Sequence, residues 1–323
     1  MPLTSFDPKE PMSAASELPS AAMDPDAEAV VAARAKMPAA NLEQLRLKYA
    51  TAGRLFAPPV PARMTTDDIH IDMQSRGFVR ARLYTPADVS TAGLLVWAHG
   101  GGWISGSVAG FDGTAAALAT ASHTRTLSID YSLAPEAPFP RAVDEVRAVI
   151  DWTQTTAGTT ALGHRLDRVV VGGDSAGGNL VTLAAASASG PMPLAGQVLA
   201  YPVTNHSVPD VTPNVYSPTL TAEALSTCWR LYLGNAETAA PQLFSPLHQE
   251  LSRLPPTLIV LAGLDILHRD GVSYGNALNA SGVSTRLATY PTMPHGFLEW
   301  ADKVRASRHA LAHIGKFVLS RAT

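Results

Sequence analysis

The chain has 323 residues, of which 46% are hydrophobic and 16% charged, and its formal net charge is -3. This composition supplies enough apolar side chains for a sizeable core and excludes a disordered chain, while the slight negative charge excludes electrostatic binding of nucleic acid, which needs a basic face. The single cysteine, Cys228, excludes a disulfide within the chain, and its surroundings lack a reactive-cysteine signature, so we expect a buried, inert thiol.

The N-terminal segment is expected to form helices after an unstructured start. Residues 1 to about 23 lack the basic start and apolar run of a signal peptide, and no stretch of the chain has the length of a membrane span, so we expect a cytoplasmic protein. A helix over Ala27–Met37 is predicted to start at Asp24-Pro25, because Asp caps free N–H groups and Pro is tolerated in the first turn. A second helix is predicted from Asn41, with Gln44 placed for a capping-box-like contact.

From about residue 66 the pattern changes to short apolar runs that alternate with helical segments. Half-buried strands are predicted over Ile69–Met73 and Phe78–Tyr84, and a further strand over Thr285–Tyr290. Runs typical of strands buried on both faces are Leu94–His99, Thr126–Asp130, Arg168–Gly172, Gln197–Tyr201 and Thr257–Ala262. Helices are predicted over Ala142–Thr153, Gly177–Ser187, Gly271–Ala280 and Lys303–Leu319. This alternation predicts an α/β fold with a mostly parallel sheet.

One connection is much longer than the others. Roughly fifty residues separate Tyr201 from Thr257, which is far above the usual loop length, and they include a helical stretch around Ala222–Leu233. We interpret this segment as an insertion at the carboxyl edge of the sheet, where sites of such sheets lie. Together with the N-terminal helices it would form a cap.

The candidate nucleophile is Ser175, in the sequence Gly173-Asp174-Ser175-Ala176-Gly177 between a predicted strand and a predicted helix. A sharp strand-to-helix turn exposes a serine hydroxyl, and the helix start supplies free N–H groups for negative charge. An ordinary glycine turn is the alternative, which the position between strand and helix disfavours. Asp174 is interpreted as structural.

A second motif, His99-Gly100-Gly101-Gly102-Trp103, follows the strand that begins at Leu94. Three successive glycines let backbone N–H groups approach a ligand closely, as an oxyanion hole requires. A flexible loop or a phosphate cradle are the alternatives. The lysine-serine pair of a nucleotide-binding loop is absent, which disfavours the phosphate cradle.

The candidate base and its partner are His295 and Asp265, each just beyond a predicted strand. A base must accept the serine proton, and a carboxylate must hold that base in the correct tautomer. The chain order Ser, Asp, His is the order that this fold uses. Asp270 is the competing carboxylate, with His268 beside it. His309 and His313 are spaced for a metal site on a helix, but we interpret them as a solvated face because a third ligand is missing.

In these motifs the sequence resembles the hormone-sensitive-lipase-like branch of α/β-hydrolases, the bacterial family IV esterases of the GDSAG subgroup. The resemblance covers the chain from about residue 66 to the end. It rests on His99–Trp103, Ser105-Gly106-Ser107, Asp130-Tyr131-Ser132-Leu133-Ala134-Pro135-Glu136, Gly173–Asn179, Tyr201-Pro202, Asp265-Ile266-Leu267 and His295-Gly296-Phe297.

The resemblance implies an eight-stranded sheet flanked by helices, with a cap made of residues 1–55 and an insertion at about 205–250 in the catalytic domain of residues 56–323. It implies Ser175 as nucleophile, His295 as base and Asp265 as its orienter. The oxyanion would be held by N–H groups of Gly101, Gly102 and Ala176. Trp103 would line the substrate pocket, and His99 would stabilise the glycine loop. A homodimer through a sheet edge is also common in that family.

These residues predict a carboxylesterase that acts on short- to medium-chain esters through an acyl-enzyme and needs no metal or organic cofactor. An amidase or N-acyl deacetylase uses the same machinery, and an acyltransferase would differ only by excluding water from the second step. A non-catalytic receptor of this fold is the alternative of another class, disfavoured because all three triad residues are present.

Overall fold

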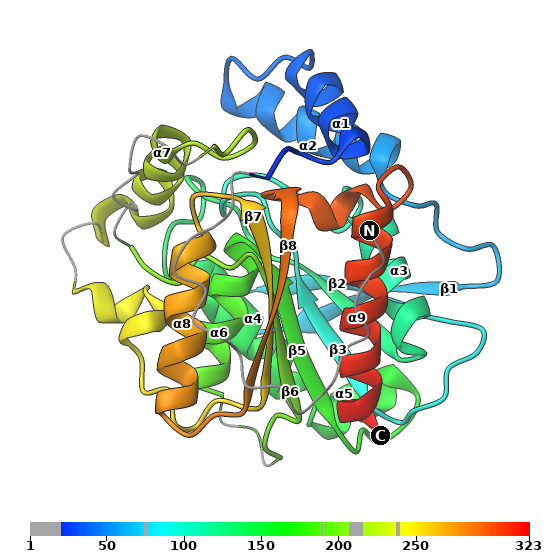
Figure 1. Cartoon of the computed structure of the whole chain (residues 1–323). Coiled ribbons are helices and arrows are strands. Elements are labelled where there is room, and N and C mark those ends of the chain that lie inside the picture. The colour runs from blue at the N-terminus through cyan, green and yellow to red at the C-terminus, as the bar shows by residue number, and fades with distance from the viewer. Residues whose placement is uncertain (1–20, 74–76, 189, 191, 207–215, 237–239) are drawn as a thin grey trace.

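A computed structural model describes residues 21–73, 77–188, 190, 192–206, 216–236 and 240–323 (Figure 1). The predicted unstructured start therefore lies mostly outside the described residues. Within them, one eight-stranded sheet runs through the molecule in the order β1-β2-β4-β3-β5-β6-β7-β8. Its strands are β1 Thr65–Asp72, β2 Phe78–Thr85, β3 Leu94–Ala98, β4 Arg125–Asp130, β5 Val169–Asp174, β6 Gly196–Ala200, β7 Thr257–Leu264 and β8 Thr285–Pro294.

The pairs β1–β2 and β2–β4 are antiparallel, and all other pairs in this sheet are parallel, which confirms the predicted sheet type. The continuous apolar runs have a direct explanation, because successive side chains enter different cores. Leu94 and Val96 pack with the α4, α6 and α8 side, whereas Leu95 and Trp97 pack with the α9 side. Both faces of the central strands are therefore buried.

The helices cover both faces of the sheet and one end of it (Figure 1). The predicted helices are present with small shifts at their ends. Two others, α3 and α5, were not predicted from the sequence. The short, small-residue sequences of these two, rich in Ala, Thr and Gly, offer no clear polar face to signal a helix. The bounds are α1 Pro25–Ala35, α2 Leu42–Phe56, α3 Asp112–Ser122, α4 Arg141–Trp152, α5 Thr156–Leu162, α6 Ala176–Ala186, α7 Ala222–Leu233, α8 His268–Ala280 and α9 Arg305–Ala322, with short 3-10 turns at Gly234–Ala236, Pro241–Leu243, Pro246–His248 and Phe297–Trp300.

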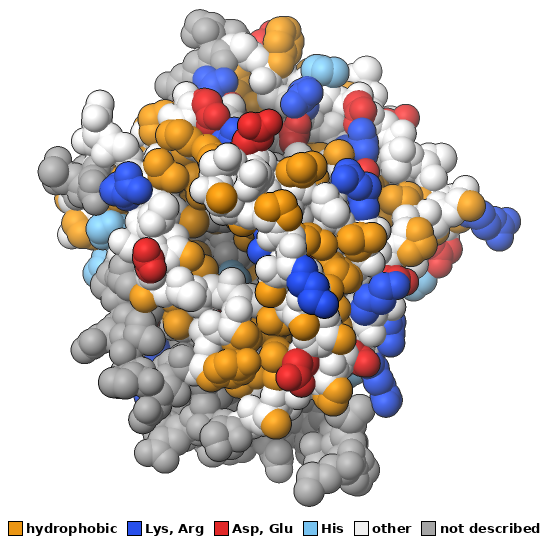
Figure 2. Space-filling model, turned by 90° about the horizontal axis from the view of Figure 1, so that it is seen from above, with side chains coloured by type: hydrophobic (Ala, Val, Ile, Leu, Met, Phe, Trp, Pro, Cys, Tyr) orange, Lys and Arg blue, Asp and Glu red, His pale blue; other side chains and the backbone are white. Residues whose placement is uncertain are grey.

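Helices α1, α2 and α7 lie above the upper end of the sheet in Figure 1. The predicted N-terminal capping residues of helices α1 and α2 are present in the structure. Asp24 accepts the N–H groups of Asp26 and Ala27 at the start of α1, and Asn41 accepts the N–H of Gln44 at the start of α2. From above, this face shows hydrophobic side chains gathered near its middle, with charged side chains among and around them (Figure 2). Among the described helices, none has the length and apolar character needed to cross a membrane.

Candidate active site

Ser175 stands on a sharp turn between β5 and α6. Its φ of 53° lies in the left-handed region that non-glycine residues rarely adopt, which is a mark of strain at a functional position. Small neighbours make the turn possible. A Cβ on Gly177 would lie 2.0 Å from the Ala98 carbonyl oxygen, and one on Gly173 would lie 2.5 Å from the Gly177 carbonyl carbon. The Gly-x-Ser-x-Gly spacing is thus required by the close approach of α6 to β3.

Ser175, His295 and Asp265 form one hydrogen-bonded chain, although they come from three separate loops. The Nε2 atom of His295 lies 2.8 Å from Ser175 Oγ, and its Nδ1 lies 2.7 Å from Asp265 Oδ2. The other carboxylate oxygen of Asp265 accepts the Leu267 N–H at 3.0 Å, which fixes the carboxylate. The His295 side chain is about 10% exposed and the Asp265 side chain about 1%, so this pair is largely shielded from bulk water. Such a chain can take a proton from the serine hydroxyl.

The competing residues of the β7–α8 turn point elsewhere. Among the described residues, no hydrogen bond joins Asp270 to His295, and the Oδ2 atom of Asp270 is buried without a hydrogen-bond partner. Burial, followed by the charge of Asp265, raises the pKa of Asp270 to about 6. His268 places its Nδ1 2.9 Å from the Ala262 carbonyl oxygen, and burial lowers its pKa. These contacts suit structural roles.

The glycine loop lies beside the β5–α6 turn and has free backbone N–H groups. Among the described residues, no carbonyl accepts the N–H of Gly101, Gly102 or Ala176. The loop is folded on itself, since the Gly101 carbonyl accepts both the N–H and the hydroxyl of Ser105, at 3.0 and 2.7 Å. Gly101 has a φ of +115° and Gly102 a φ of +62°, which only glycine adopts without strain. Gly101 and Gly102 of the glycine loop and Ala176 at the start of α6 therefore supply three N–H groups that no carbonyl accepts among the described residues.

His99 and Asp174 hold the first part of the loop. His99 is fully buried and stacks on the rings of Phe111 and Tyr131, at 5.0 and 4.4 Å between centroids, and burial lowers its pKa. Asp174 Oδ1 accepts the Gly100 N–H at 3.0 Å. Burial, followed by the charge of Glu299, raises the pKa of Asp174 well above its ordinary value. Neither side chain makes a hydrogen bond to Ser175 Oγ or His295 among the described residues, and their supporting roles stay a prediction.

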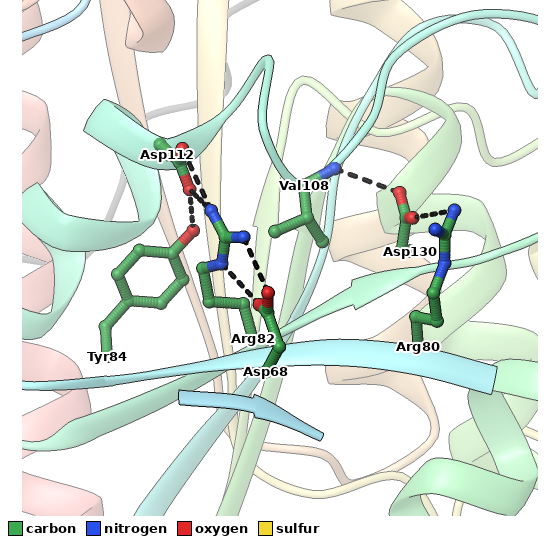
Figure 3. A network of polar contacts seen from close by, with 7 residues as sticks. All are labelled: Asp68, Arg80, Arg82, Tyr84, Val108, Asp112 and Asp130. Atoms are coloured by element: carbon green, nitrogen blue, oxygen red, sulfur yellow. Dashed lines mark hydrogen bonds and ion pairs between the residues drawn. The ribbon is translucent and has the colours of Figure 1, made fainter. Parts of the chain in front are cut away.

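Asp130, the last residue of β4, and Tyr131, the next residue, also hold the segment around the glycine loop. The Tyr131 hydroxyl donates to the His99 carbonyl at 2.8 Å, and Asp130 Oδ1 accepts the Val108 N–H at 3.1 Å. Figure 3 shows that Asp130 is in turn paired with Arg80, at 2.8 Å. The neighbouring Arg82 binds Asp68 and Asp112 in the same view. The Asp130-Tyr131 motif thus has a structural task at the glycine loop.

Trp103 lies against α7. Its φ of 62° is strained, its side chain is fully buried, and its ring stacks on Tyr232 of α7 at 4.6 Å and contacts Trp229 at 4.3 Å. The Trp103 side chain thus contacts α7, and the lining of the pocket by Trp103 stays a prediction. Cys228 of α7 lies against the loop, because a Cβ on Gly102 would stand 2.6 Å from its Sγ. Cys228 is half-buried, not fully buried as expected. This partial burial raises the pKa of Cys228 to about 11, which suits an inert thiol.

Two residues that contact the site, Thr219 and Arg46, were not predicted from the sequence. The Thr219 hydroxyl, just before α7, donates to the His295 carbonyl at 2.8 Å. Arg46 of α2 donates from Nε to the Ile104 carbonyl at 2.8 Å. Neither belongs to a motif, and each meets its partner across a gap of more than fifty positions in the sequence. Only the three-dimensional arrangement reveals them.

The described contacts of His309 do not support a metal site shared with His313. His309 Nδ1 lies 3.0 Å from the Tyr290 hydroxyl. In the part of the chain that the structure describes, no group of three His, Cys, Asp or Glu side chains is arranged to hold a metal ion.

Comparisons with known proteins identify the class. The sequence profile of the α/β hydrolase fold matches residues 95–299, which is more than half of the chain. The chain is 36% identical over 253 residues to carboxylesterase NlhH of Mycobacterium tuberculosis, covering 76% of this chain and 78% of that protein. It is 30% identical over 288 residues to ethyl acetate hydrolase of Pseudomonas putida, covering 86% and 90%. The chain belongs to the α/β hydrolase family.

Solved structures narrow this class further. An esterase of the bacterial hormone-sensitive lipase family matches with a TM-score of 0.81 and 28% identity, over 94% of this chain and all of that one. A hyperthermophilic esterase of the archaeon Pyrobaculum calidifontis matches with a TM-score of 0.81 and 28% identity, over 93% and 99%. The expected resemblance is confirmed, and the protein is a carboxylic ester hydrolase of this branch.

Proposed function

We propose that this esterase cleaves short- to medium-chain carboxylic esters with Ser175 as nucleophile, His295 as general base and Asp265 as the residue that orients His295. One observation carries the proposal. The three side chains form a continuous hydrogen-bonded chain, with 2.8 Å between Ser175 Oγ and His295 Nε2 and 2.7 Å between His295 Nδ1 and Asp265 Oδ2.

In the first step, Ser175 Oγ bonds to the ester carbonyl carbon while its proton passes to His295 Nε2. The carbonyl oxygen gains the negative charge and is held by the N–H groups of Gly101, Gly102 and Ala176. The tetrahedral intermediate then collapses. The bond to the alcohol oxygen breaks, and His295 gives its proton to the departing alkoxide, leaving an acyl group on Ser175.

In the second step, water repeats the sequence. His295 takes a proton from water as its oxygen attacks the acyl carbon, and the same N–H groups hold the second oxyanion. Collapse breaks the bond to Ser175 Oγ, which recovers a proton from His295, and the carboxylic acid leaves. The steps balance with ester and water alone, so no metal or organic cofactor is needed.

We also propose that residues 1–55 and about 205–250 act as the cap, which with Trp103 limits the substrate to small esters. The stacking of Trp103 on Tyr232 supports this view, because it ties the glycine loop to α7. A homodimer and a cytoplasmic location remain predictions.

The test is hydrolysis of p-nitrophenyl esters from acetate to palmitate by the wild type, Ser175→Ala and a matched serine variant. Ser187→Ala is the control, because that serine is exposed at the far end of α6. We expect activity on the shorter esters, retained in Ser187→Ala and reduced by several orders of magnitude in Ser175→Ala. Folded wild type inactive on every ester, or an active Ser175→Ala, contradicts the proposal. The matching p-nitroanilides test for amidase activity.

A further inference from the structure

Arg46 of α2 connects the N-terminal helices with the glycine loop. Its Nε donates to the Ile104 carbonyl at 2.8 Å, and its Nη2 donates to the Ala134 carbonyl at 3.1 Å. Ile104 lies two residues after Gly102, one of the expected oxyanion donors. Arg46 therefore reaches the loop from the side of the cap, through the loop's backbone.

Glu136 fixes the direction of this guanidinium. Its two oxygens accept from Nη1 and Nη2 of Arg46 at 2.8 and 2.7 Å, the paired geometry that suits the planar arginine fork. Hydrogen bonding to Arg46 lowers the pKa of Glu136 to about 2, so the carboxylate stays ionised under ordinary assay conditions. Glu136 is largely exposed, and such pairs contribute little to stability. What the pair does provide is orientation of the guanidinium.

The two carbonyls that Arg46 binds belong to one small unit. The Ala134 N–H donates to the Trp103 carbonyl at 2.9 Å, and the Ile104 N–H donates to the Gly101 carbonyl at 3.3 Å. Holding Ile104 and Ala134 together thus fixes the peptides from Gly101 to Ile104 against the segment after β4. The N–H groups of Gly101 and Gly102 lie within this stretch.

We propose that Arg46 is a positioning residue of the esterase: by binding the Ile104 and Ala134 carbonyls, it sets the oxyanion donors of the glycine loop and makes their placement depend on docking of α2. Oxyanion donors act only when they are fixed in advance at the right distance, within a few tenths of an ångström. The inference rests on the proposed function, because it needs an oxyanion at this loop. It assigns a role in the chemical step to a side chain that never touches substrate.

The test compares Arg46→Ala, Arg46→Lys, Glu136→Gln and the control Arg54→Ala in the full-length chain. Arg54 is an exposed arginine on the same helix. With p-nitrophenyl acetate, we expect Arg46→Ala to lower kcat about 10-fold with KM changed less than about 3-fold, which is a fraction of the loss when an oxyanion donor is deleted. Arg46→Lys and Glu136→Gln should lie between Arg46→Ala and the wild type, and Arg54→Ala should match the wild type.

A second readout separates positioning from general stability. A trifluoromethyl ketone adds to the serine and places an oxyanion at the loop, so its Ki should rise in proportion to the loss in kcat/KM. Values of kcat and Ki for Arg46→Ala equal to those of Arg54→Ala overturn the inference, and so does a loss in kcat with unchanged Ki. If Arg46→Ala does not fold, the same two criteria apply to Arg46→Lys. A wild type without esterase activity instead refutes the proposed function, so the two failures are distinguishable.

Discussion

The two carboxylates that follow β7 offer a sharp test of the site, because they lie five residues apart and only Asp265 meets His295. Asp265→Asn replaces an acceptor of the Nδ1–H by an amide that can donate to the ring. The imidazole is then held with its proton on Nε2, where it cannot accept the Ser175 proton. In serine proteases with such a triad, the same change lowers kcat by about 10⁴-fold.

We therefore expect Asp265→Asn to lower kcat by roughly 10³- to 10⁴-fold, which corresponds to about 4–5.5 kcal/mol of activation free energy. Asp270→Asn is the matched control and should retain kcat within about 3-fold, because Asp270 makes no hydrogen bond to His295. The assay is p-nitrophenyl acetate hydrolysis at pH 8, with circular dichroism to show that both variants fold. Equal losses in the two variants, or a larger loss in Asp270→Asn, would refute the assignment of Asp265.

Asp270 should instead affect the pH dependence of the free energy of unfolding. Burial and the charge of Asp265 raise its pKa from 3.8 to about 6. A raised carboxyl pKa favours the folded state most below about pH 4, and this contribution is lost as the pH rises through about 6. The shift corresponds to on the order of 2 kcal/mol, after a reduction for partial burial. Urea denaturation at pH 4.5, 5.5 and 7.5 should show Asp270→Asn gaining stability relative to the wild type as the pH rises. A difference that does not change with pH contradicts this reading.

Two further changes probe the loop and the base. Gly102→Ala places a methyl 2.6 Å from Cys228 Sγ at a φ of +62°, so we expect at least about a 10-fold loss in kcat on p-nitrophenyl acetate; unchanged kcat would show that Gly102 is not a donor. Thr219→Val removes the hydroxyl that binds the His295 carbonyl and should lower kcat about 3- to 10-fold, while Thr219→Ser should restore it. Equal kcat values for the Val and Ser variants would exclude this role.

Much of the fold could be predicted because local sequence and global structure agree. The central strands read as continuous apolar runs, since each buries one set of side chains on each face of the sheet. The caps at Asp24 and Asn41 were predictable because each is a local contact within three residues. Helix α3 could not be predicted from the sequence, because it is buried on most sides and its small side chains show no amphipathic period.

Some residues of the candidate site could be predicted from the sequence, and others could not. Ser175, His295 and Asp265 could be predicted, because each follows a strand end and parallel strands bring such ends together at one edge. Arg46 and Thr219 could not, because they act on backbone carbonyls, and a carbonyl carries no sequence signature. Their partners Ile104 and His295 lie 58 and 76 positions away in the chain.

The most direct test of the account is the identity of the nucleophile. A fluorophosphonate reacts with an activated serine to form a stable adduct, and peptide mass spectrometry of the digested protein locates the modified residue. We predict stoichiometric labelling of Ser175 with matching loss of esterase activity, and no labelling in His295→Ala, where Ser175 lacks its base. Labelling at another residue, or labelling of Ser175 without loss of activity, would contradict the central claim.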